Sequence, residues 1–507
     1  MALSGRLSRA TLGSVPAECR ERTAGPDLGG GILHLGLGAF HRAHQAVYTE
    51  DAVAAGGGDW GIVGVAPRSR DVPDRLAGQD RLFSVTARGR DGAATRVVGV
   101  LTGALHAPSD PAAVVGLLAD PAIRVVTLTV TEKGHRLDPA TGRLRTDDPA
   151  LRRELAAARA AARAADRPPA TVPGLLVRGL VERALADAAP VTVLSCDNLP
   201  RNGERLAGLV DQALALVPEP AAGRARAWIE RNAAFPSCMV DRIVPAPDDA
   251  TRAGAARTLG VEDRAAVAAE PFSQWVIEDA FAAGRPAWEL AGATLTADVG
   301  PWETLKLRVL NGAHSTLAYL GALAGLATTA EAMALPGMPE LLGRLWDEDV
   351  APTLTPPPGI DGAAYRRQVL ERFANPAITH HTLQVAMDGS QKLPQRLVGT
   401  VVDRLRAGAA PRWAALAVAA WIRFAAGRAD GGGELPLSDP LGGRIRAALA
   451  GAAPGHAGTA DALLGLREVF GDEPAADAGF RALVAGWLAD LDAHGVAGTV
   501  AGLRGAG

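Results

Sequence analysis

The sequence predicts an α/β fold in two domains, the first built on a parallel β-sheet and the second mostly α-helical. Short apolar runs bounded by turn residues alternate with helical patterns in the first part of the chain. This alternation is typical of a parallel sheet that helices cover on both faces. From about residue 296 the strand signals fade and helical patterns dominate. Because 507 residues exceed one ordinary domain, we expect a first domain over residues 1–295 and a second over 296–507.

Four apolar runs are the expected strands of the sheet. The lead-in over residues 1–30 is poorly patterned, and the first strand follows it and leads through a glycine turn into a helix expected over residues 39–55. A segment rich in Ala and Arg, residues 150–166, is expected to be a solvent-facing helix. The expected strands are residues 32–35, 60–66, 125–130 and 190–195.

Helical periodicity recurs through the second domain. It is interrupted by a Pro-rich stretch at residues 352–359, which is expected to be a loop. The expected helices are residues 302–325, 338–350, 361–374, 395–407, 411–426 and 476–494.

The composition excludes several classes of partner. A net charge of −3 without a cluster of Lys or Arg argues against nucleic acid and an anionic membrane surface. Three cysteines far apart in the sequence form no CxxC, so neither a disulfide framework nor a zinc site is expected. The most apolar stretch, residues 413–422, is too short to cross a bilayer. We expect a cytoplasmic protein that binds a small molecule, with no membrane partner.

A glycine turn, Gly36-Leu37-Gly38, follows the first expected strand. A Rossmann-like domain needs glycine there, because the backbone must approach a pyrophosphate at the start of the next helix. A complete fingerprint would have a third glycine where this chain has His41. The predicted cofactor-binding residues are Gly36, Leu37, Gly38, Ala39, Phe40, His41, Arg42 and Ala43.

The choice between NAD and NADP depends on the residues after the second strand. Asp71 could bind the ribose hydroxyls of NAD, whereas Arg68 or Arg70 could bind the 2′-phosphate of NADP. Nearby, His41 and His44 stand at helical spacing, but nothing supplies a third metal ligand. We therefore interpret both histidines as structural, or as lining the cofactor cleft.

Lysine is rare in this chain. Only three of its 52 basic residues are lysine: Lys133, Lys306 and Lys392. A partly buried amine can release its proton near neutral pH, which a guanidinium does not do. A lysine in so arginine-rich a background is therefore a candidate for proton transfer.

Lys306 lies close in sequence to Asn311 and His314. On an α-helix the two residues would lie roughly 140° and roughly 80° from the lysine, so all three could line one wall of a cleft. The lysine could then act as general base for an alcohol while amide groups hold the developing oxyanion. The alternative is an amphipathic helix with a solvated lysine. The Tyr-x-x-x-Lys pair of short-chain dehydrogenases is absent, and three scattered cysteines do not supply the ligands of a zinc enzyme.

The sequence resembles the polyol-specific long-chain dehydrogenases, the mannitol dehydrogenase and fructuronate reductase family. The resemblance runs from about residue 30 to the C-terminal helices and rests on six motifs. They are HLGLGAFHRAHQA (34–46), TLTVTEKGH (127–135), SCDNLPRNG (195–203), MVDRIVPA (239–246), EPFSQWVIED (270–279) and KLRVLNGAH (306–314).

The resemblance implies a Rossmann-like N-terminal domain, a helical C-terminal domain with the active site between the two, and metal-free chemistry with NAD. Lys306 would be the general acid or base, and Asn198 and Asn311 would form the oxyanion hole. His314 would orient the substrate hydroxyl. Family members are often monomeric, so we expect a monomer or a weak oligomer.

Two acidic residues also match the family. Asp241 in the motif MVDRI would contact the substrate, and Glu303 would help pass protons to solvent. The departure from the glycine fingerprint at His41 is shared by the family, so the resemblance supports nucleotide binding.

Two stretches separate the substrates within the family. Mannitol dehydrogenases tend to have TEGGY, and an arginine before a late DGS motif, where this chain has TEKGH and Gln384. Both features resemble fructuronate reductases, although His135 replaces the usual tyrosine. Lys133 or Lys392 could bind the carboxylate of a sugar acid. We expect a fructuronate reductase that makes D-mannonate, with mannitol 2-dehydrogenase as the alternative. A non-catalytic nucleotide-binding sensor is disfavoured by the presence of Lys306.

Overall fold

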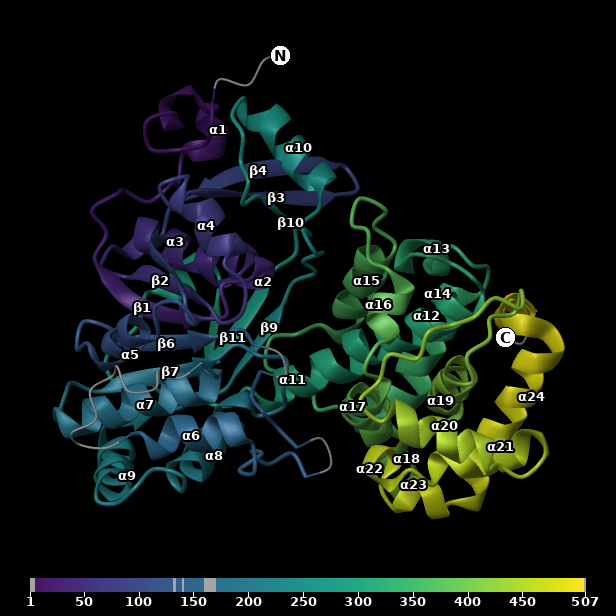
Figure 1. Cartoon of the computed structure of the whole chain (residues 1–507). Helices are drawn as coiled ribbons and strands as arrows, with labels where there is room; N and C mark the ends of the chain where they lie inside the picture. Colours follow the sequence, from purple (N-terminus) through teal and green to yellow (C-terminus); the bar gives the residue numbers. More distant parts are fainter. Residues whose placement is uncertain (1–4, 131–133, 139–140, 159–169, 506–507) are drawn as a thin grey trace. The chain divides into compact units, whose positions relative to one another are not determined.

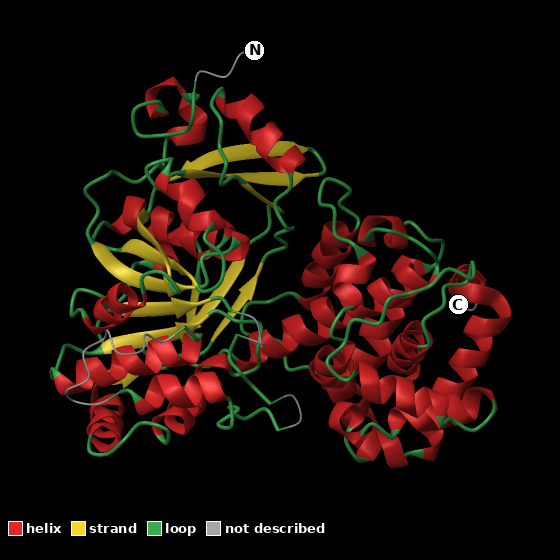
Figure 2. Ribbon diagram, in the orientation of Figure 1, coloured by secondary structure: helices red, strands yellow, loops and turns green. Residues whose placement is uncertain are grey.

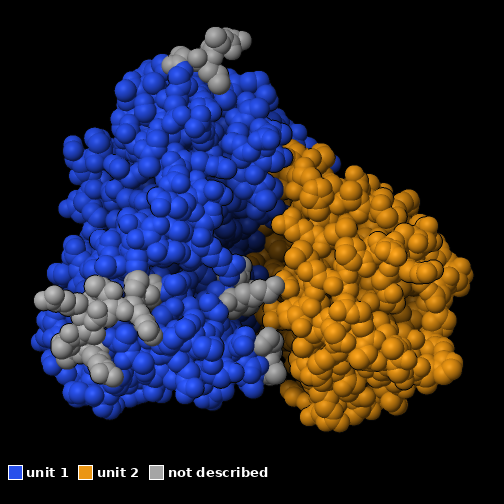
Figure 3. Space-filling view, in the orientation of Figure 1, with its two compact units in different colours: residues 1–299 blue, residues 300–507 orange. Residues whose placement is uncertain are grey.

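The computed structural model describes residues 5–130, 134–138, 141–158 and 170–505. The chain forms two compact units, residues 1–299 and residues 300–507, which Figure 3 shows in different colours. Each unit is described below by itself.

A six-stranded parallel sheet is the centre of the first unit (Figure 1). Its strand order is β5-β2-β1-β6-β7-β8, so the four expected strands are its four central members and the predicted parallel sheet is confirmed. The strands are β1 (Gly30–Leu35), β2 (Gly61–Ala66), β5 (Leu101–His106), β6 (Val125–Leu128), β7 (Val191–Ser195) and β8 (Ala233–Ala234).

Both faces of this sheet are buried, because successive side chains of a strand point to opposite faces. Leu33 and Leu35 of β1 belong to one apolar cluster, whereas Ile32 belongs to another. The first cluster packs under α5 (Pro111–Ala119), α6 (Pro149–Ala156), α7 (Val172–Leu185), α8 (Asn202–Leu214) and α9 (Ala221–Asn232). The second packs under α3 (Gln45–Gly56) and η2 (Trp288–Ala291).

Two small sheets were not expected from the sequence. One has the order β10-β3-β4 and the other β12-β11-β9. Their strands are short or mix polar with apolar residues, and β10 pairs with β3 from a distant part of the chain, so neither sheet leaves a strong local pattern. The strands are β3 (Phe83–Gly89), β4 (Gly92–Val98), β9 (Cys238–Asp241), β10 (Val267–Ala269), β11 (Gln274–Glu278) and β12 (Thr294–Thr296).

The lead-in packs against the first of these small sheets instead of standing apart. Leu7 and Val15 join an apolar cluster with Val97 of β4 and Leu259. The elements concerned are η1 (Leu12–Ser14), α1 (Ala17–Arg20) and α10 (Asp249–Leu259). The helix α4 (Asp71–Ala77) instead packs against β2 and β5.

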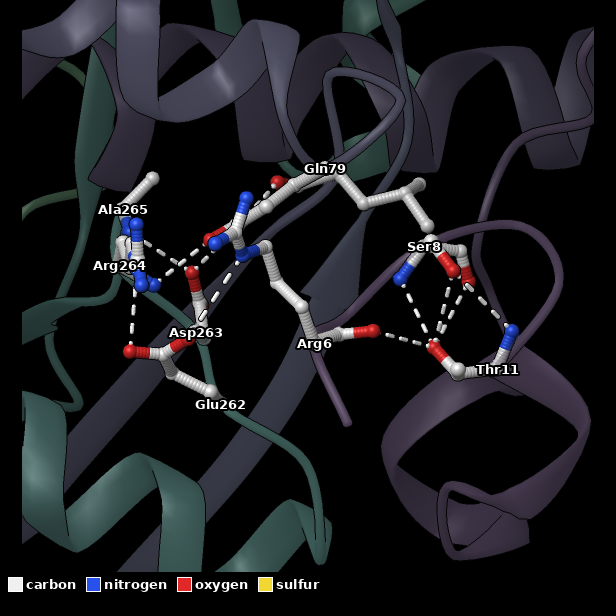
Figure 4. A network of polar contacts seen from close by, with 9 residues as sticks. Arg6, Ser8, Thr11, Gln79, Glu262, Asp263, Arg264 and Ala265 are labelled. Atoms are coloured by element: carbon white, nitrogen blue, oxygen red, sulfur yellow. Dashed lines mark hydrogen bonds and ion pairs between the residues drawn. The ribbon is translucent and has the colours of Figure 1, made fainter. Parts of the chain in front are cut away.

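A buried carboxylate fixes the loop before β10 (Figure 4). Asp263 is 1% exposed and accepts hydrogen bonds from Gln79 Nε2 at 2.8 Å and Ala265 N at 2.8 Å. It also accepts two bonds from Ser84, at 2.6 Å from the amide and 2.6 Å from the hydroxyl. Four donors compensate the cost of burying this charge. The loop in turn presents the Ala265 carbonyl to the buried guanidinium of Arg42, just after the glycine turn.

The second unit consists of helices and connecting loops over its described residues 300–505 (Figure 2), so the predicted helical domain is confirmed. Its core lies around α12 and α19, which pack against each other and against α16 and α24. The α-helices are α11 (Gly300–Leu305), α12 (Gly312–Leu323), α13 (Thr329–Met333), α14 (Met338–Arg344), α15 (Gly362–Phe373), α16 (Thr382–Ala386), α17 (Gly389–Leu393), α18 (Gly399–Arg406), α19 (Arg412–Ala425), α20 (Gly442–Ala450), α21 (Gly455–Leu464), α22 (Arg467–Phe470), α23 (Glu473–Ala476) and α24 (Ala478–Ala501).

The most apolar stretch of the chain forms α19, which is buried on nearly every side. A helix that is apolar all round belongs in the middle of a helical domain. Among the described residues, no helix is both long and apolar enough to cross a membrane.

Several helices expected to be continuous α-helices change their hydrogen-bonding pattern. The predicted helix over residues 302–325 contains a π-helical segment, η3 (Lys306–Asn311), between α11 and α12. Two further π segments, η4 (Leu345–Val350) and η6 (Pro394–Val398), lie against η3. Short 3₁₀ segments, η5 (Ala351–Thr353) and η7 (Gly502–Gly505), complete the unit. The predicted helix over residues 39–55 is also two helices, α2 (Ala39–Ala43) and α3, which separate at His44.

Candidate active site

Cavities of about 410 Å³ and about 310 Å³ lie on the first unit. A larger one, of about 650 Å³, opens at the carboxyl ends of the parallel strands. The strand order of the sheet reverses at β1, because β2 lies on one side of it and β6 on the other. Nucleotides bind at such a switch point in open α/β sheets. The cavity is lined by the residues that follow β1, β2 and β6, together with residues 170–172. This is the place expected for a dinucleotide.

The glycine turn borders this cavity, and its first glycine is required by the backbone. Gly36 has φ +117°, and a Cβ added to it would lie 2.1 Å from the Thr129 carbonyl oxygen. Gly38 is extended, and its added Cβ would meet only the Gly36 carbonyl oxygen, at 3.6 Å. The turn thus lies tight against β6 at Gly36 and leaves room for a ligand at Gly38.

A buried histidine and a threonine hold the turn. Thr129 Oγ1 donates to the Gly36 carbonyl at 2.9 Å, and the His34 ring lies within hydrogen-bond distance of that carbonyl and of Thr127 and Thr129. Burial lowers the pKa of His34 to about 3, so the ring is neutral at physiological pH. Thr129 is a site residue that sequence reasoning missed, although it lies within the TLTVTE motif.

The second half of the predicted cofactor segment lies behind the turn. Leu37 lines the cavity with the two glycines, whereas Ala39, Phe40, His41, Arg42 and Ala43 are not among its lining residues. The His41 ring stacks on His34 with centroids 3.4 Å apart. Burial lowers the pKa of Arg42 to about 10, and its side chain donates to the Gly38 carbonyl at 3.2 Å. These side chains support the turn from the protein interior.

At the other end of the cavity, the loop after β2 presents Arg68 and Ser69. His106 Nε2 lies 3.0 Å from the Arg68 carbonyl oxygen and holds this loop. Asp71 begins α4 and does not line the cavity; its amide donates to Ser69 Oγ at 3.0 Å. Arg70 is directed to Ser109 and Asp74. Among the described residues that line the cavity, this loop supplies a guanidinium and a hydroxyl, and none is a carboxylate.

The SCDN motif begins at the last residue of β7 and contains a buried network of hydrogen bonds. Asp197 accepts hydrogen bonds from Val130 N at 2.5 Å and Ser195 Oγ at 2.9 Å, and its Oδ2 lies 2.6 Å from His135 Nε2. Asn198, the predicted oxyanion residue, is the next residue and is exposed. His135 therefore ties the TEKGH stretch to the loop that presents Asn198. Lys133 lies outside the described residues.

Asp241, the predicted substrate contact, is 4% exposed at the end of β9. The fold also brings together two cysteines that are far apart in the sequence: the Cys238 thiol donates to the Ser195 carbonyl at 3.1 Å, next to Cys196 in the SCDN motif. Within the part of the chain that the structure describes, no group of three or more His, Cys, Asp or Glu side chains could hold a metal ion.

In the second unit, the π segment η3 begins at Lys306 and ends at Asn311, which are 7% and 5% exposed. Gly312 N donates to the Leu307 carbonyl, the five-residue pattern of a π-helix. The separation of about 140° expected for an α-helix is therefore wrong, because residues five apart stand on one face of a π turn. Trp346 Nε1 donates to the Val309 carbonyl at 3.0 Å and stabilises the irregular turn.

His314 lies on α12, just beyond Asn311, and is 8% exposed. Its ring stacks on Phe373 with centroids 5.0 Å apart and contacts His380 at 4.7 Å. Asn311 Oδ1 and His314 Nε2 are buried without a hydrogen-bond partner. Buried polar atoms are nearly always satisfied in proteins, so this pair is suited to bind the hydroxyl groups of a substrate.

The remaining predicted substrate residues lie on three other elements. Glu303 is 9% exposed on α11, and Gln384 is exposed on α16. Lys392 on α17 donates from Nζ to the Val385 carbonyl at 3.1 Å. Its charge is close enough to lower the pKa of both His314 and His380. The structure thus brings Lys392 to His314.

Two arginines near His314 were missed by sequence reasoning. Arg372 and Arg396 are each 8% exposed. Burial is the main cause of the lowered pKa of His314, and the charges of both arginines lower it further. Arg396 Nη1 donates to Ser315 Oγ at 3.0 Å. Arg396 lies in the stretch that contains Gln384 and Lys392, and Arg372 lies just before it. In a chain so rich in arginine, the sequence around these two residues does not indicate that they are buried.

Comparison with known proteins agrees with this arrangement. Residues 30–290 match the mannitol dehydrogenase Rossmann domain, and residues 298–488 match the mannitol dehydrogenase C-terminal domain. The chain is 42% identical over 446 residues to the uncharacterized oxidoreductase YeiQ of Escherichia coli K12, covering 87% of this chain and 88% of that protein. It is 40% identical over 479 residues to the D-mannonate oxidoreductase of the same strain, covering 93% and 95%.

A solved structure is similar over the full length. It is the Pseudomonas fluorescens mannitol 2-dehydrogenase in ternary complex with NAD and D-mannitol, with a TM-score of 0.87, 35% identity and 99% coverage of each chain. Two matched domains in the expected order, and relatives that cover nearly all of the sequence, establish the family. The chain belongs to the mannitol dehydrogenase family of oxidoreductases.

Proposed function

We propose that this protein interconverts D-fructuronate and D-mannonate with NAD(H). The observation that carries the substrate class is the group of cationic side chains, Arg372, Lys392 and Arg396, around the buried His314. A sugar acid brings a carboxylate, which charge-assisted donors bind more strongly than neutral groups do. The similarity to a D-mannonate oxidoreductase over nearly the whole chain supports the same choice.

The cavity at the glycine turn fits a dinucleotide. Its volume is about 650 Å³, and the open side of Gly38 leaves space where a pyrophosphate would approach the backbone. NADH bound there supplies the hydride for carbonyl reduction. The protein's own contribution is to hold this turn through Gly36 and Thr129 and to present donors to the ribose through Arg68 and Ser69.

Lys306 is proposed as the general acid in the reductive direction and the general base in the oxidative one. Its ammonium would protonate the alkoxide oxygen as the ketone carbon becomes a secondary alcohol. Asn311 and Asn198 would donate to that oxygen while negative charge develops, and such donors stabilise a transition state strongly when they are fixed in place. His314 would orient a neighbouring hydroxyl, Asp241 would bind the polyol chain, and Glu303 would exchange the lysine proton with solvent.

The second candidate is mannitol 2-dehydrogenase activity. The full-length similarity to the Pseudomonas enzyme favours it. Gln384 weighs against it, since an arginine is usual before the DGS motif of mannitol dehydrogenases and an uncharged side chain stands here.

Oxidation of NADH against a panel of D-fructuronate, D-tagaturonate and D-fructose decides between the two candidates. We expect kcat/KM for D-fructuronate to exceed that for D-fructose by at least about 10²-fold, the value of roughly two charge-assisted contacts. Faster turnover of D-fructose would favour the mannitol enzyme. No turnover of any sugar would contradict the proposed activity.

We expect Arg68 to allow the protein to bind NADPH as well as NADH. Its guanidinium lines the ribose end of the cavity, where many NAD enzymes have a carboxylate. Arg68→Ala should weaken the binding of NADPH about 10-fold or more, while that of NADH changes less than about 3-fold. Fluorescence titration with both cofactors measures this. Arg70→Ala is the matched control, because Arg70 is directed to Asp74 and Ser109 and should leave both affinities unchanged.

A further inference from the structure

One half-buried histidine near the Lys306 helix has no role in the mechanism described above. His380 lies in the loop between α15 and α16, and its ring centroid is 4.7 Å from that of His314. Its Nδ1 atom is buried and has no hydrogen-bond partner. Its backbone is held, because the His380 carbonyl accepts a hydrogen bond from Thr329 N at 3.0 Å. The backbone of His380 is therefore held, and its ring carries a buried nitrogen without a partner among the described residues.

The surroundings of the two histidine rings are electropositive. The charged groups that act on His314 are His380, Arg396, Lys392 and Arg372, and those that act on His380 are Lys392 and His381. All of them are cationic groups or histidines. Burial lowers the pKa of His380 to about 4, and Lys392 lowers it further, so the ring is a neutral hydrogen-bonding group at physiological pH.

Two carboxylates of the second unit act on a neighbouring tyrosine. Asp388 and Asp439 act on the Tyr319 hydroxyl together with Arg396. Asp439 accepts hydrogen bonds from Ser390 at 2.8 Å and 2.5 Å. Their bonding is local to the turn before α17, which leaves the histidine rings in cationic surroundings.

A six-carbon sugar acid needs a binding group for its carboxylate at a distance from the reacting carbon. In D-fructuronate three carbon atoms separate the reacting ketone from the carboxylate. Lys306 and Asn311 lie on η3, His314 follows on α12, and the His380 ring centroid is 4.7 Å from that of His314. A substrate whose ketone lies at the lysine and whose middle hydroxyl lies at His314 would direct its carboxylate toward His380.

We propose that His380, together with Lys392, forms the subsite for the substrate carboxylate. The neutral imidazole would donate a hydrogen bond to one carboxylate oxygen, and the Lys392 ammonium would supply the opposite charge. This inference rests on the proposed function, since it assigns the carboxylate that distinguishes a sugar acid from a polyol. His380 would then be a specificity residue, remote from the reacting carbon.

The test compares substrates that differ at the carboxylate. D-mannonate and D-mannitol share their carbon chain and differ at one end, as do D-fructuronate and D-fructose. For His380→Asn we expect kcat/KM for D-fructuronate and D-mannonate to fall about 10- to 100-fold, mainly through KM, the loss of one or two charge-assisted contacts. The values for D-fructose and D-mannitol should change less than about 3-fold, and NADH affinity should not change.

His381→Asn is the matched control. His381 is the adjacent residue, and its side chain is exposed to solvent. This variant should keep the wild-type preference for sugar acids. If His380→Asn does not fold, as thermal unfolding would show, Lys392→Met tests the same subsite and should shift the preference in the same direction.

Equal losses for acid and polyol substrates would show that His380 only supports His314, and would overturn the proposal. An unchanged preference in both His380→Asn and Lys392→Met would overturn it as well. The proposed function fails in a different way, namely if the wild-type protein does not reduce D-fructuronate or prefers D-fructose.

Discussion

Lys306→Ala is expected to lower kcat by about 10³-fold or more while the affinity for NADH stays within about 3-fold of wild type. A positioned general acid contributes roughly 10²- to 10⁴-fold to a rate, and alanine offers no proton. Lys306 lies in the second unit, whereas the cofactor cavity is built from residues of the first, so cofactor binding should survive. Stopped-flow turnover and fluorescence titration measure the two effects separately.

Two further variants define what the lysine does. Lys306→Arg retains a cation but not a group that releases its proton near neutral pH, so it should remain nearly inactive. Arg308→Ala alters the same π segment, but Arg308 is directed to Asp403 at 2.7 Å and to the Thr353 carbonyl at 3.2 Å. It should retain most of the activity. Substantial turnover by Lys306→Ala would show that another group transfers the proton.

Gly36→Ala is expected to destabilise the first unit by roughly 3–5 kcal/mol and to abolish NADH binding. The residue has φ +117°, a conformation that L side chains rarely adopt, and the new Cβ would lie 2.1 Å from the Thr129 carbonyl oxygen. That atom belongs to the backbone next to β6, so it cannot move without disturbing the central sheet. Thermal unfolding and NADH titration measure the outcome.

Gly38→Ala is the control for this variant. Gly38 is extended, and its new Cβ would lie 3.6 Å from the Gly36 carbonyl oxygen and touch nothing else. Its unfolding free energy should change by less than about 1 kcal/mol. Because the methyl group enters the cavity where a pyrophosphate would lie, NADH affinity should fall about 10-fold or more. Normal NADH binding by Gly36→Ala would show that the cofactor does not bind at this turn.

The central strands were predictable because each is a short, nearly continuous apolar run. Both faces of the sheet are covered, so every residue of β6 and β7 is buried and polarity does not interrupt the pattern. The strands β3 and β4 were missed because they are partly exposed, and β4 includes Arg96 and Thr95. Hydrophobic periodicity reports burial, so the half-exposed β4 is difficult to detect even though it pairs with the neighbouring β3.

The arrangement within the helix that carries Lys306 could not be predicted either. A continuous α-helix would separate Lys306 from Asn311, and the sequence KLRVLNGAH contains nothing that excludes one. The π turn forms where η3 packs against η4 and η6, and Trp346 donates to the Val309 carbonyl. Tertiary contacts from two distant segments stabilise this irregular turn, and they place the amine and the amide on one face.

Alone, the amino-acid sequence determined the class of fold, the glycine turn and the lysine that became the centre of the proposed chemistry. These features are local: alternating apolar runs, a glycine between strand and helix, and an amine among arginines are legible within a few residues. Only the tertiary structure decided which side chains meet, such as His314 with His380 and Lys392, or His135 with Asp197. The physical reason is that burial and electrostatic surroundings depend on segments far apart in the chain, which no local pattern records.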